Sequence, residues 1–127
     1  MAEATKETKE KEFRALHRYA RISAEKVRPV ADLVRGLPVN RALVLLQLNK
    51  KRGAYLLRKV LQSAVANATQ TDTDVRVNRL YVKRVWVDHA GLLHKRVRWR
   101  PGPMGRAMPI RKRQSHIGVI VAEGAKE

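Results

Sequence analysis

The sequence predicts an α+β fold that consists of three helices, three strands and a long basic extension before the last strand. Two patterns predict the body of this fold. Apolar residues recur at helical spacing between residues 23 and 68, whereas runs rich in β-branched and aromatic residues flank that region on both sides. A third pattern predicts the extension, because no acidic residue occurs between Asp88 and Glu123.

The composition is strongly basic. The chain has 127 residues, of which 28 are Lys or Arg and 11 are Asp or Glu, so its formal net charge is +17. Such a chain repels itself and is stabilised when an anionic partner neutralises it. Its length suits a single domain with one modest core. Because Phe, Trp and Tyr make up only 5% of the residues, the composition argues against a platform of aromatic rings that stacks single-stranded bases.

The chain has no cysteine, which excludes disulfides and thiolate metal sites. Its N-terminus lacks the apolar segment of a signal peptide, and no run approaches the roughly 20 apolar residues that span a bilayer. We therefore expect a soluble, intracellular protein with no membrane partner.

The polar ends of the chain set the expected domain limits. Residues 1–12 alternate Lys and Glu with small residues, bury nothing and are expected to form a disordered tail. A single domain then covers residues 13–122, and residues 123–127 form a C-terminal tail.

The first strand is expected over residues 13–22. Larger or apolar side chains alternate there mainly with basic ones, so one face of the strand is basic. The positions on the other face are Phe13, Ala15, His17 and Tyr19.

The first helix is predicted to follow Ser23, whose side chain suits an N-cap, with Glu25 in the first turn to complement the helix dipole. Gly36 ends it as a C′ residue. Pro29 conflicts with this helix, because its ring clashes with the preceding turn and it has no N–H to donate. The helix therefore either kinks at Pro29 or begins later.

Two more helices are predicted before the sheet resumes. A short one covers residues 40–48, after Pro38. The next is the most regular and should lie in the core, with Asn49 as its cap and basic residues on its outer face. Its apolar positions follow helical spacing: Leu57, Val60, Leu61, Ala64, Val65 and Ala68.

Two further strands are predicted in the C-terminal half. Residues 75–88 are rich in Val, Tyr and Trp, and their apolar phase shifts along the run, which indicates a bulge or burial on both faces. Residues 117–121 alternate Ile and Val with small or polar residues and form the return strand.

The 24 residues 89–112 are too many for an ordinary hairpin loop. Continued outward as two strands, they form an arm on the order of 40 Å long, which the body is too small to cover. Unpaired guanidinium groups are costly to desolvate, so the arm must lie against something negative. A phosphate backbone is the usual partner of Arg. A disordered basic loop is the alternative, and it requires the same kind of partner.

The sequence offers no convincing catalytic or metal site. Ser115 and His116 are neighbours in a strand, so their side chains point to opposite faces and cannot act as a nucleophile and its base. Asp72 and Asp74 are typical turn formers, and the four histidines lack the spacing of zinc ligands. We therefore predict a protein that is not an enzyme and has neither a cofactor nor a metal.

Three anionic partners suit the arm: RNA, DNA and an acidic protein. A basic β-arm occurs in DNA-architectural proteins, where Pro103 or Met104 would wedge between bases. An adaptor for an acidic protein ranks last, because Arg beside Gly suits phosphate better than carboxylates spread over a protein surface. Competition between folded rRNA and bent duplex DNA separates the first two.

Six short motifs occur along the chain. They read SAEKVR at 23–28, DLVRG at 32–36, KVLQSAVANA at 59–68, KR at 95–96, MGRA at 104–107 and IRKRQSHI at 110–117. In order and spacing these motifs resemble those of the family of large-subunit ribosomal protein twenty-two, from about Arg18 to Val121.

The resemblance implies that the three helices pack on a small three-stranded antiparallel sheet and that a long basic β-hairpin protrudes from it. In this family the body lies near the exit of the nascent-peptide tunnel, and the arm forms part of the tunnel wall. The protein would be a cytoplasmic, structural constituent of the large ribosomal subunit that bridges several rRNA domains early in assembly. Its partners would be 23S rRNA, neighbouring large-subunit proteins and the nascent polypeptide, and it would not form a homo-oligomer.

The same resemblance implies which residues bind RNA. Basic residues of the arm hold it against rRNA, and basic residues of the body join them. The expected rRNA-binding residues are Arg18, Arg21, Lys26, Arg28, Arg35, Arg58, Lys59, Lys83, Arg84, Lys95, Arg96, Arg98, Arg106, Arg111, Lys112 and Arg113. The tip, which would approach the tunnel lumen, comprises Trp99, Arg100, Pro101, Gly102, Pro103, Met104 and Gly105.

The tip departs from the family's pattern. Residues 99–103 separate the Lys-Arg-Val-Arg and Met-Gly-Arg-Ala motifs, and this spacing is longer than the family usually has, so we expect a larger tip. Trp99 either stacks on a base or packs across the ribbon, and packing is the preferred interpretation.

Overall fold

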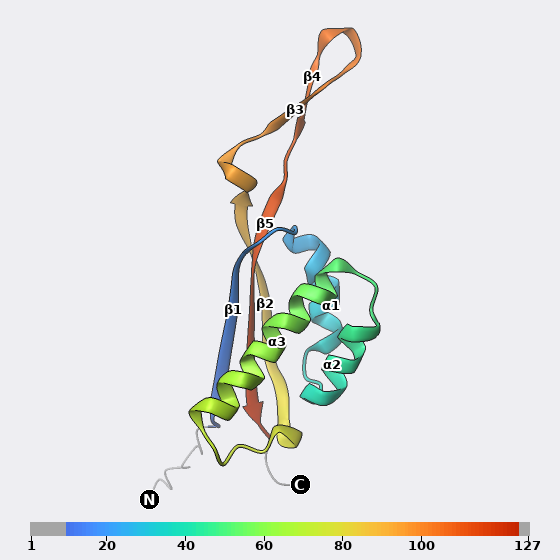
Figure 1. The fold of residues 1–127 in the computed structure, drawn as a ribbon. Coiled ribbons are helices and arrows are strands. Elements are labelled where there is room, and N and C mark those ends of the chain that lie inside the picture. The colour runs from blue at the N-terminus through green and yellow to red at the C-terminus, as the bar shows by residue number, and fades with distance from the viewer. Residues whose placement is uncertain (1–9, 125–127) are drawn as a thin grey trace, which may run out of the picture.

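In the computed structural model, which describes residues 10–124, three antiparallel strands form the sheet of the body (Figure 1). They are β1 (Glu12–Ala20), β2 (Leu80–Leu92) and β5 (Arg113–Glu123), and their order in the sheet is β1-β5-β2. The last strand in sequence therefore lies in the middle and pairs with both of the others.

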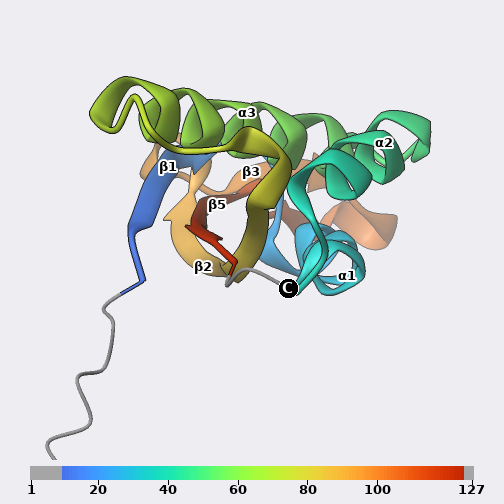
Figure 2. The same ribbon diagram turned by 90° about the horizontal axis from the view of Figure 1, so that it is seen from below.

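Three helices cover one face of this sheet (Figure 2). They are α1 (Ala24–Val34), α2 (Val39–Leu48) and α3 (Arg52–Thr71). α3 packs on β1 and β5, whereas α1 packs mainly on β2. The predicted fold class is confirmed, with a two-stranded hairpin projecting beyond the body (Figure 1).

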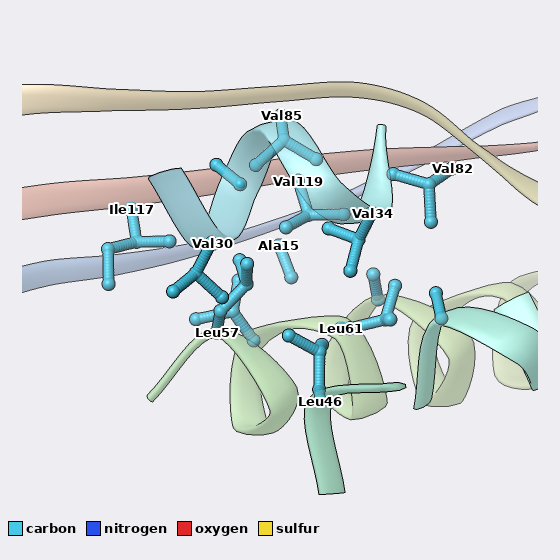
Figure 3. Packing of buried hydrophobic residues seen from close by; sticks show 14 of the residues in the cluster. Ala15, Val30, Val34, Leu46, Leu57, Leu61, Val82, Val85, Ile117 and Val119 are labelled. Atoms are coloured by element: carbon cyan, nitrogen blue, oxygen red, sulfur yellow. The ribbon is translucent and has the colours of Figure 1, made fainter. Parts of the chain in front are cut away.

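The core forms where the inward faces of the helices meet the inward face of the sheet (Figure 3). Its members are almost all Val, Leu, Ile and Ala, so burial of apolar surface stabilises the body without internal polar networks. The side chains labelled in the close-up view are Ala15, Val30, Val34, Leu46, Leu57, Leu61, Val82, Val85, Ile117 and Val119.

α1 begins directly after Ser23 and contains Pro29, so the alternative that the helix begins later is wrong. Ser23 occupies the N-cap position, although its side chain makes no capping hydrogen bond. Gly36 has a φ of +80° and follows the C-cap, as predicted for a C′ residue. Its N–H donates to the carbonyl oxygen of Val82 at 2.9 Å, which joins the end of α1 to β2.

The two other helices follow their predictions closely. α2 begins at Val39, one residue before its predicted start. α3 keeps the predicted core face, but Val65 is only half-buried and Ala54 extends that face toward the N-terminus. Asn49 was wrongly predicted as the cap of α3, because its Oδ1 accepts a hydrogen bond from the N–H of Lys51, which is itself the N-cap residue.

The first strand breaks its predicted alternation near its end. Phe13 and Ala15 are buried as predicted, but Tyr19 is 59% exposed. The pairing of β1 with β5 shifts between His17 and Ala20, and Tyr19 has a φ of +54°. This bulge places Ala20 on the inward face and turns Tyr19 away from the core.

The second predicted strand starts later than expected and runs further. Residues 75 and 76 form a loop and Val77–Arg79 form a 3₁₀ turn, so β2 begins only at Leu80. The predicted bulge is present, because the register with β5 shifts between Val82 and Arg84.

The ends of the described region are held by polar contacts. Glu12, predicted at the end of a disordered tail, is instead the first residue of β1, and Glu10 and Lys11 make ion pairs with the body. The rest of the predicted N-terminal tail, residues 1–9, lies outside the described residues, as do residues 125–127 of the predicted C-terminal tail.

Candidate nucleic-acid interface

The arm, residues 89–112, begins where β2 and β5 leave the body. Their ladder ends at the pair of Leu92 with Arg113, and a second ladder begins further out. That ladder joins β3 (Arg98–Pro101) to β4 (Ala107–Ile110) and forms the outer part of the hairpin (Figure 1). The arm therefore consists of an inner extension of the sheet and an outer two-stranded ribbon.

A short irregular segment separates the two ladders. It contains the turn η2 (Leu93–Lys95), in which His94 and Lys95 each have a φ of 56°. The N–H of Leu93 still donates to the carbonyl oxygen of Lys112 at 2.7 Å. Residues other than glycine rarely have positive φ, and here two of them lie between the two ladders.

Of the predicted tip, residues 99–101 belong to β3. Its end is a tight turn, η3 (Pro103–Gly105), closed by a hydrogen bond from the N–H of Gly102 to the carbonyl oxygen of Arg106 at 2.6 Å. A Cβ atom on Gly102 would lie 2.9 Å from that oxygen, so only glycine fits there. Gly105 has a φ of +72° and Met104 is 97% exposed at the turn.

Trp99 lies opposite Pro109 in the outer ribbon and remains 65% exposed. The ribbon therefore does not bury the indole, and a face of the ring remains open to solvent. Met108 is also half exposed, so apolar groups are interspersed among the cations of the outer ribbon.

The cationic side chains between residues 95 and 113 are all exposed. Within the described residues, none of them makes an ion pair or a side-chain hydrogen bond. No carboxylate occurs between Asp88 and Glu123 to oppose them. The unopposed cations are Lys95, Arg96, Arg98, Arg100, Arg106, Arg111, Lys112 and Arg113.

A basic cleft of about 470 Å³ lies at the base of the arm. Its cations are Arg21 before α1, Lys26 in the first turn of α1, Arg52 at the start of α3, and residues 111–113 of the arm, and Glu25 is the one carboxylate in its lining. The fold thus gathers cations from three distant segments at one place. Sequence reasoning left Arg52 out of the site, although the run of cations at residues 50–52 marks the start of α3 as strongly basic.

Two of the predicted RNA-binding residues, Arg28 and Arg35, have structural partners. Nη2 of Arg28 donates to the carbonyl oxygen of Val87 at 3.2 Å, and Nη2 of Arg35 donates to that of Val85 at 3.0 Å. These bonds tie α1 to β2 on the side where β2 lacks a neighbouring strand. Nη1 of Arg35 also donates to Oδ1 of Asp32 at 2.6 Å.

Two predicted residues on α3, Arg58 and Lys59, lie against Tyr55. The guanidinium carbon of Arg58 is 5.5 Å from the ring centroid and Nζ of Lys59 is 4.5 Å from it, which are cation–π distances. A hydrogen bond with Lys59 lowers the pKa of the Tyr55 hydroxyl. Nε of Arg58 is buried without a hydrogen-bond partner, which leaves this group unsatisfied on the protein side.

Lys83 is already neutralised by carboxylates. Its Nζ lies 2.5 Å from Oε1 of Glu12 and 3.0 Å from Oε2 of Glu10, and these hydrogen bonds raise the pKa of the lysine. The next residue, Arg84, is exposed and makes no ion pair within residues 10–124. Of these two predicted residues, Arg84 is thus the better placed for an external anion.

The structure bears directly on the catalytic and metal alternatives. Ser115 is fully buried, whereas His116 lies on the other face of the sheet, where its Nδ1 accepts a hydrogen bond from the N–H of Tyr19. Among residues 10–124 no three His, Cys, Asp or Glu side chains are grouped as metal ligands would be. No helix in the same region is long and apolar enough to cross a membrane.

Comparisons with known proteins match nearly the whole folded region. The family model described as "Ribosomal protein L22p/L17e" matches residues 15–122. A large ribosomal subunit protein uL22 from Desulfotalea psychrophila is 49% identical over 112 residues, which cover 88% of this chain and 98% of the relative. The uL22 proteins of Thermus thermophilus and Bdellovibrio bacteriovorus are 49% and 45% identical over the same share of this chain, covering 96% and 98% of those relatives.

Proposed function

Because the chain belongs to the ribosomal protein L22p/L17e family, we propose that it binds 23S rRNA and bridges several rRNA domains as the large subunit assembles. It is a structural protein and not an enzyme. In this proposal its arm lies in the wall of the nascent-peptide exit tunnel, and the protein acts in the cytoplasm as part of the large subunit.

The observation that carries the proposal is the unopposed charge of the arm. Eight exposed cations follow one another from Lys95 to Arg113 without a carboxylate among them. Arg binds phosphate oxygens through two parallel hydrogen bonds, and each contact releases counterions condensed on the RNA. These contacts offset the backbone entropy lost when the arm is ordered, about 1 to 2 kcal/mol per residue.

The basic cleft supports the bridging role. It combines cations of the arm with cations of the body, so one RNA segment held there contacts Lys112, Arg21 and Arg52 together. A second RNA segment along the outer ribbon would meet Arg98 or Arg106. Contacts from one protein to RNA segments distant in sequence favour compaction of the RNA.

The tip suits a position beside a passing polypeptide. It presents Met104, nearly fully exposed, and glycines that allow close approach of the backbone. An exposed thioether on a tight turn is flexible and apolar, so it contacts varied side chains without holding one strongly. The nascent polypeptide is therefore a proposed partner of the tip.

Neighbouring ribosomal proteins are proposed partners of the helical layer. Leu33 on α1 and both Val44 and Leu48 on α2 are exposed, and Leu48 is 75% exposed. Such side chains on the outer side of a small body suit contacts with another protein.

The test measures binding to a 23S rRNA transcript as a function of salt. The variant Arg111→Gln/Lys112→Gln/Arg113→Gln removes three cations at the base of the arm. The slope of log K against log salt should become shallower by about 2 to 3, because each phosphate contact contributes roughly 0.7 to 0.9. An unchanged slope would reject the arm as an electrostatic anchor.

Lys83→Gln is the matched control, because that lysine is already paired with Glu10 and Glu12. Its salt slope should stay close to that of the unmodified protein. Native protein should also sediment with the large subunit at moderate salt. Bent duplex DNA that competes as well as the transcript would instead favour a DNA-architectural protein.

A further inference from the structure

A second site lies on the face of the sheet opposite the helices, where side chains of all three strands line a pocket. We call it the sheet pocket, lined by Arg14, Leu16, Arg18, Tyr19, Trp86, Asp88 and His116. Two aromatic rings and an imidazole converge there, in a chain with few aromatic residues. Neither the arm nor the basic cleft includes any of these residues.

The floor of the sheet pocket depends on a glycine of the central strand. Trp86 on β2 is paired with Gly118 on β5, and its half-buried indole lies where a side chain of residue 118 would be. Leu16 of β1 is paired with Gly118 from the other side. The missing side chain therefore allows the indole to lie across the middle strand as a flat surface.

The wall of the sheet pocket is built by the bulge in β1. Tyr19 is held at a φ of +54°, a conformation that a bulky residue rarely adopts. Its N–H donates to Nδ1 of His116 at 3.1 Å, and the two rings meet edge to face with centroids 4.7 Å apart. Because Nδ1 accepts this bond, the neutral imidazole carries its proton on Nε2, which is a donor.

The rim of the sheet pocket has charges of both signs. Arg14 and Arg18 are exposed, and their side chains make no ion pair within the described residues. Asp88 is opposite His116 in the ladder, and it is likewise unpaired within residues 10–124. The pocket thus offers flat rings for stacking, cations for a phosphate and a carboxylate that accepts hydrogen bonds.

We propose that the sheet pocket binds one unpaired nucleobase of the RNA, in contact with the rings of both Tyr19 and Trp86, with its phosphate held by Arg14 and Arg18. This inference rests on the proposed RNA-binding function. A nucleotide is the ligand that combines a flat π-face with an adjacent anion, and proteins read unpaired bases by stacking them on rings. Asp88 only accepts hydrogen bonds, so it favours a base that carries an amino group.

The first experiment removes the ring while keeping the strained backbone. Tyr19→Asn suits this purpose, because Asn tolerates positive φ far better than other side chains. We expect it to weaken binding to the 23S rRNA transcript by about tenfold, within the range for loss of one stacked base. Tyr19→Phe, which keeps the ring, should bind like the unmodified protein.

The salt dependence separates stacking from charge. Tyr19→Asn removes no cation, so its salt slope should equal that of the unmodified protein, whereas Arg18→Gln should reduce the slope by about one. Equal binding of Tyr19→Asn and Tyr19→Phe would overturn the proposal. Circular dichroism melting of both variants checks that the body remains folded.

The second experiment observes Trp86 directly. In a Trp99→Phe variant Trp86 is the only tryptophan, since the chain has two. Stacking of a base should quench its fluorescence when the transcript is added, and inorganic polyphosphate should not. Equal effects of the two probes, or no change with the transcript, would overturn the proposal.

These outcomes are distinct from those for the arm. If the glutamine variant of residues 111–113 loses salt dependence while Trp86 is unaffected by RNA, the arm anchors RNA and the sheet pocket does not take a base. If RNA does not bind the unmodified protein at all, the proposed function itself fails.

Discussion

Trp86 occupies the space above Gly118: a Cβ atom on Gly118 would lie 2.3 Å from both Cε2 and Cζ2 of the indole. No real Cβ contact is that short, so the two residues are complementary in shape. A glycine in a central strand costs conformational entropy. Because Gly118 has no side chain, however, the sheet has room for the indole of Trp86.

We expect Gly118→Ala to destabilise the body by about 1 to 3 kcal/mol, because the indole must leave its position or the strands must separate. Urea unfolding followed by circular dichroism measures this change. In a Trp86→Leu background the same substitution should cost much less, since the colliding ring is gone. An equal cost in both backgrounds would show that the indole is not what excludes a side chain at residue 118.

A different glycine tests backbone conformation alone. Gly36 has a φ of +80°, and no heavy atom lies within 4 Å of the position that a Cβ would take, so Gly36→Ala introduces strain and no collision. We expect a loss of about 1 kcal/mol in the free energy of unfolding. Gly36→Asn should lose less, because Asn tolerates this conformation. Equal losses for the two variants would contradict the assignment of the effect to φ.

Arg35 is expected to stabilise the folded body through its hydrogen bonds. Arg35→Ala removes the hydrogen bond to Val85 and the ion pair with Asp32, which should cost about 1 kcal/mol. Arg35→Lys keeps the charge but has no forked donor to reach both partners, so it should lose much of the same stability. Arg41→Ala on α2 removes an exposed Arg without a side-chain hydrogen bond in the described region, and chemical unfolding should show little change.

Stability should fall in acid because of the N-terminal ion pairs. Hydrogen bonds from Lys83 and then Tyr81 lower the pKa of Glu10 below its ordinary value of 4.5. Lys11 likewise lowers the pKa of Asp72 below 3.8. A carboxyl group whose pKa is lowered by folding stabilises the folded state at pH values above its pKa in the unfolded chain. This contribution is lost as the pH falls through the group's pKa in the folded state.

The free energy of unfolding should therefore decrease as pH falls below about 4.5, and Glu10→Gln should flatten that decrease. Asp88→Asn, which removes an exposed carboxylate without an ion pair in the described region, should keep the acid dependence of the unmodified protein. The acid dependence of each variant is measured as the urea midpoint of unfolding across this pH range. A Glu10→Gln profile parallel to that of the unmodified protein would reject the contribution of this pair.

Much of the fold was predictable because the core follows regular periods. The inward face of α3 was read from its spacing, and the bulge of β2 from its phase shift near Val82. The prediction for the first strand failed at Tyr19, because Phe13, Ala15, His17 and Tyr19 alternate without a phase shift, and the bulge appears only in the pairing of β1 with β5. The predicted start of β2 was wrong, because Val77 has strand propensity but belongs to a 3₁₀ turn and pairs with no strand.

The candidate site divides in a similar way. The cations of the arm are visible from charge alone, because no nearby acid offsets them. Lys83 could not be distinguished from the unpaired cations by sequence, because its partners Glu10 and Glu12 lie 73 and 71 residues away along the chain. The sheet pocket was not foreseen, because it requires residues of three strands and a bulge to come together.

The gap between the two ladders of the arm has a mechanical consequence. Between the pair of Leu92 with Arg113 and the pair of Arg98 with Ile110, the two sides of the arm are joined only by the backbone hydrogen bond from Leu93 to Lys112 in the described structure. The outer ribbon is thus joined to the body by few contacts between its two sides, so we expect the direction in which it points to depend on the surface that it binds.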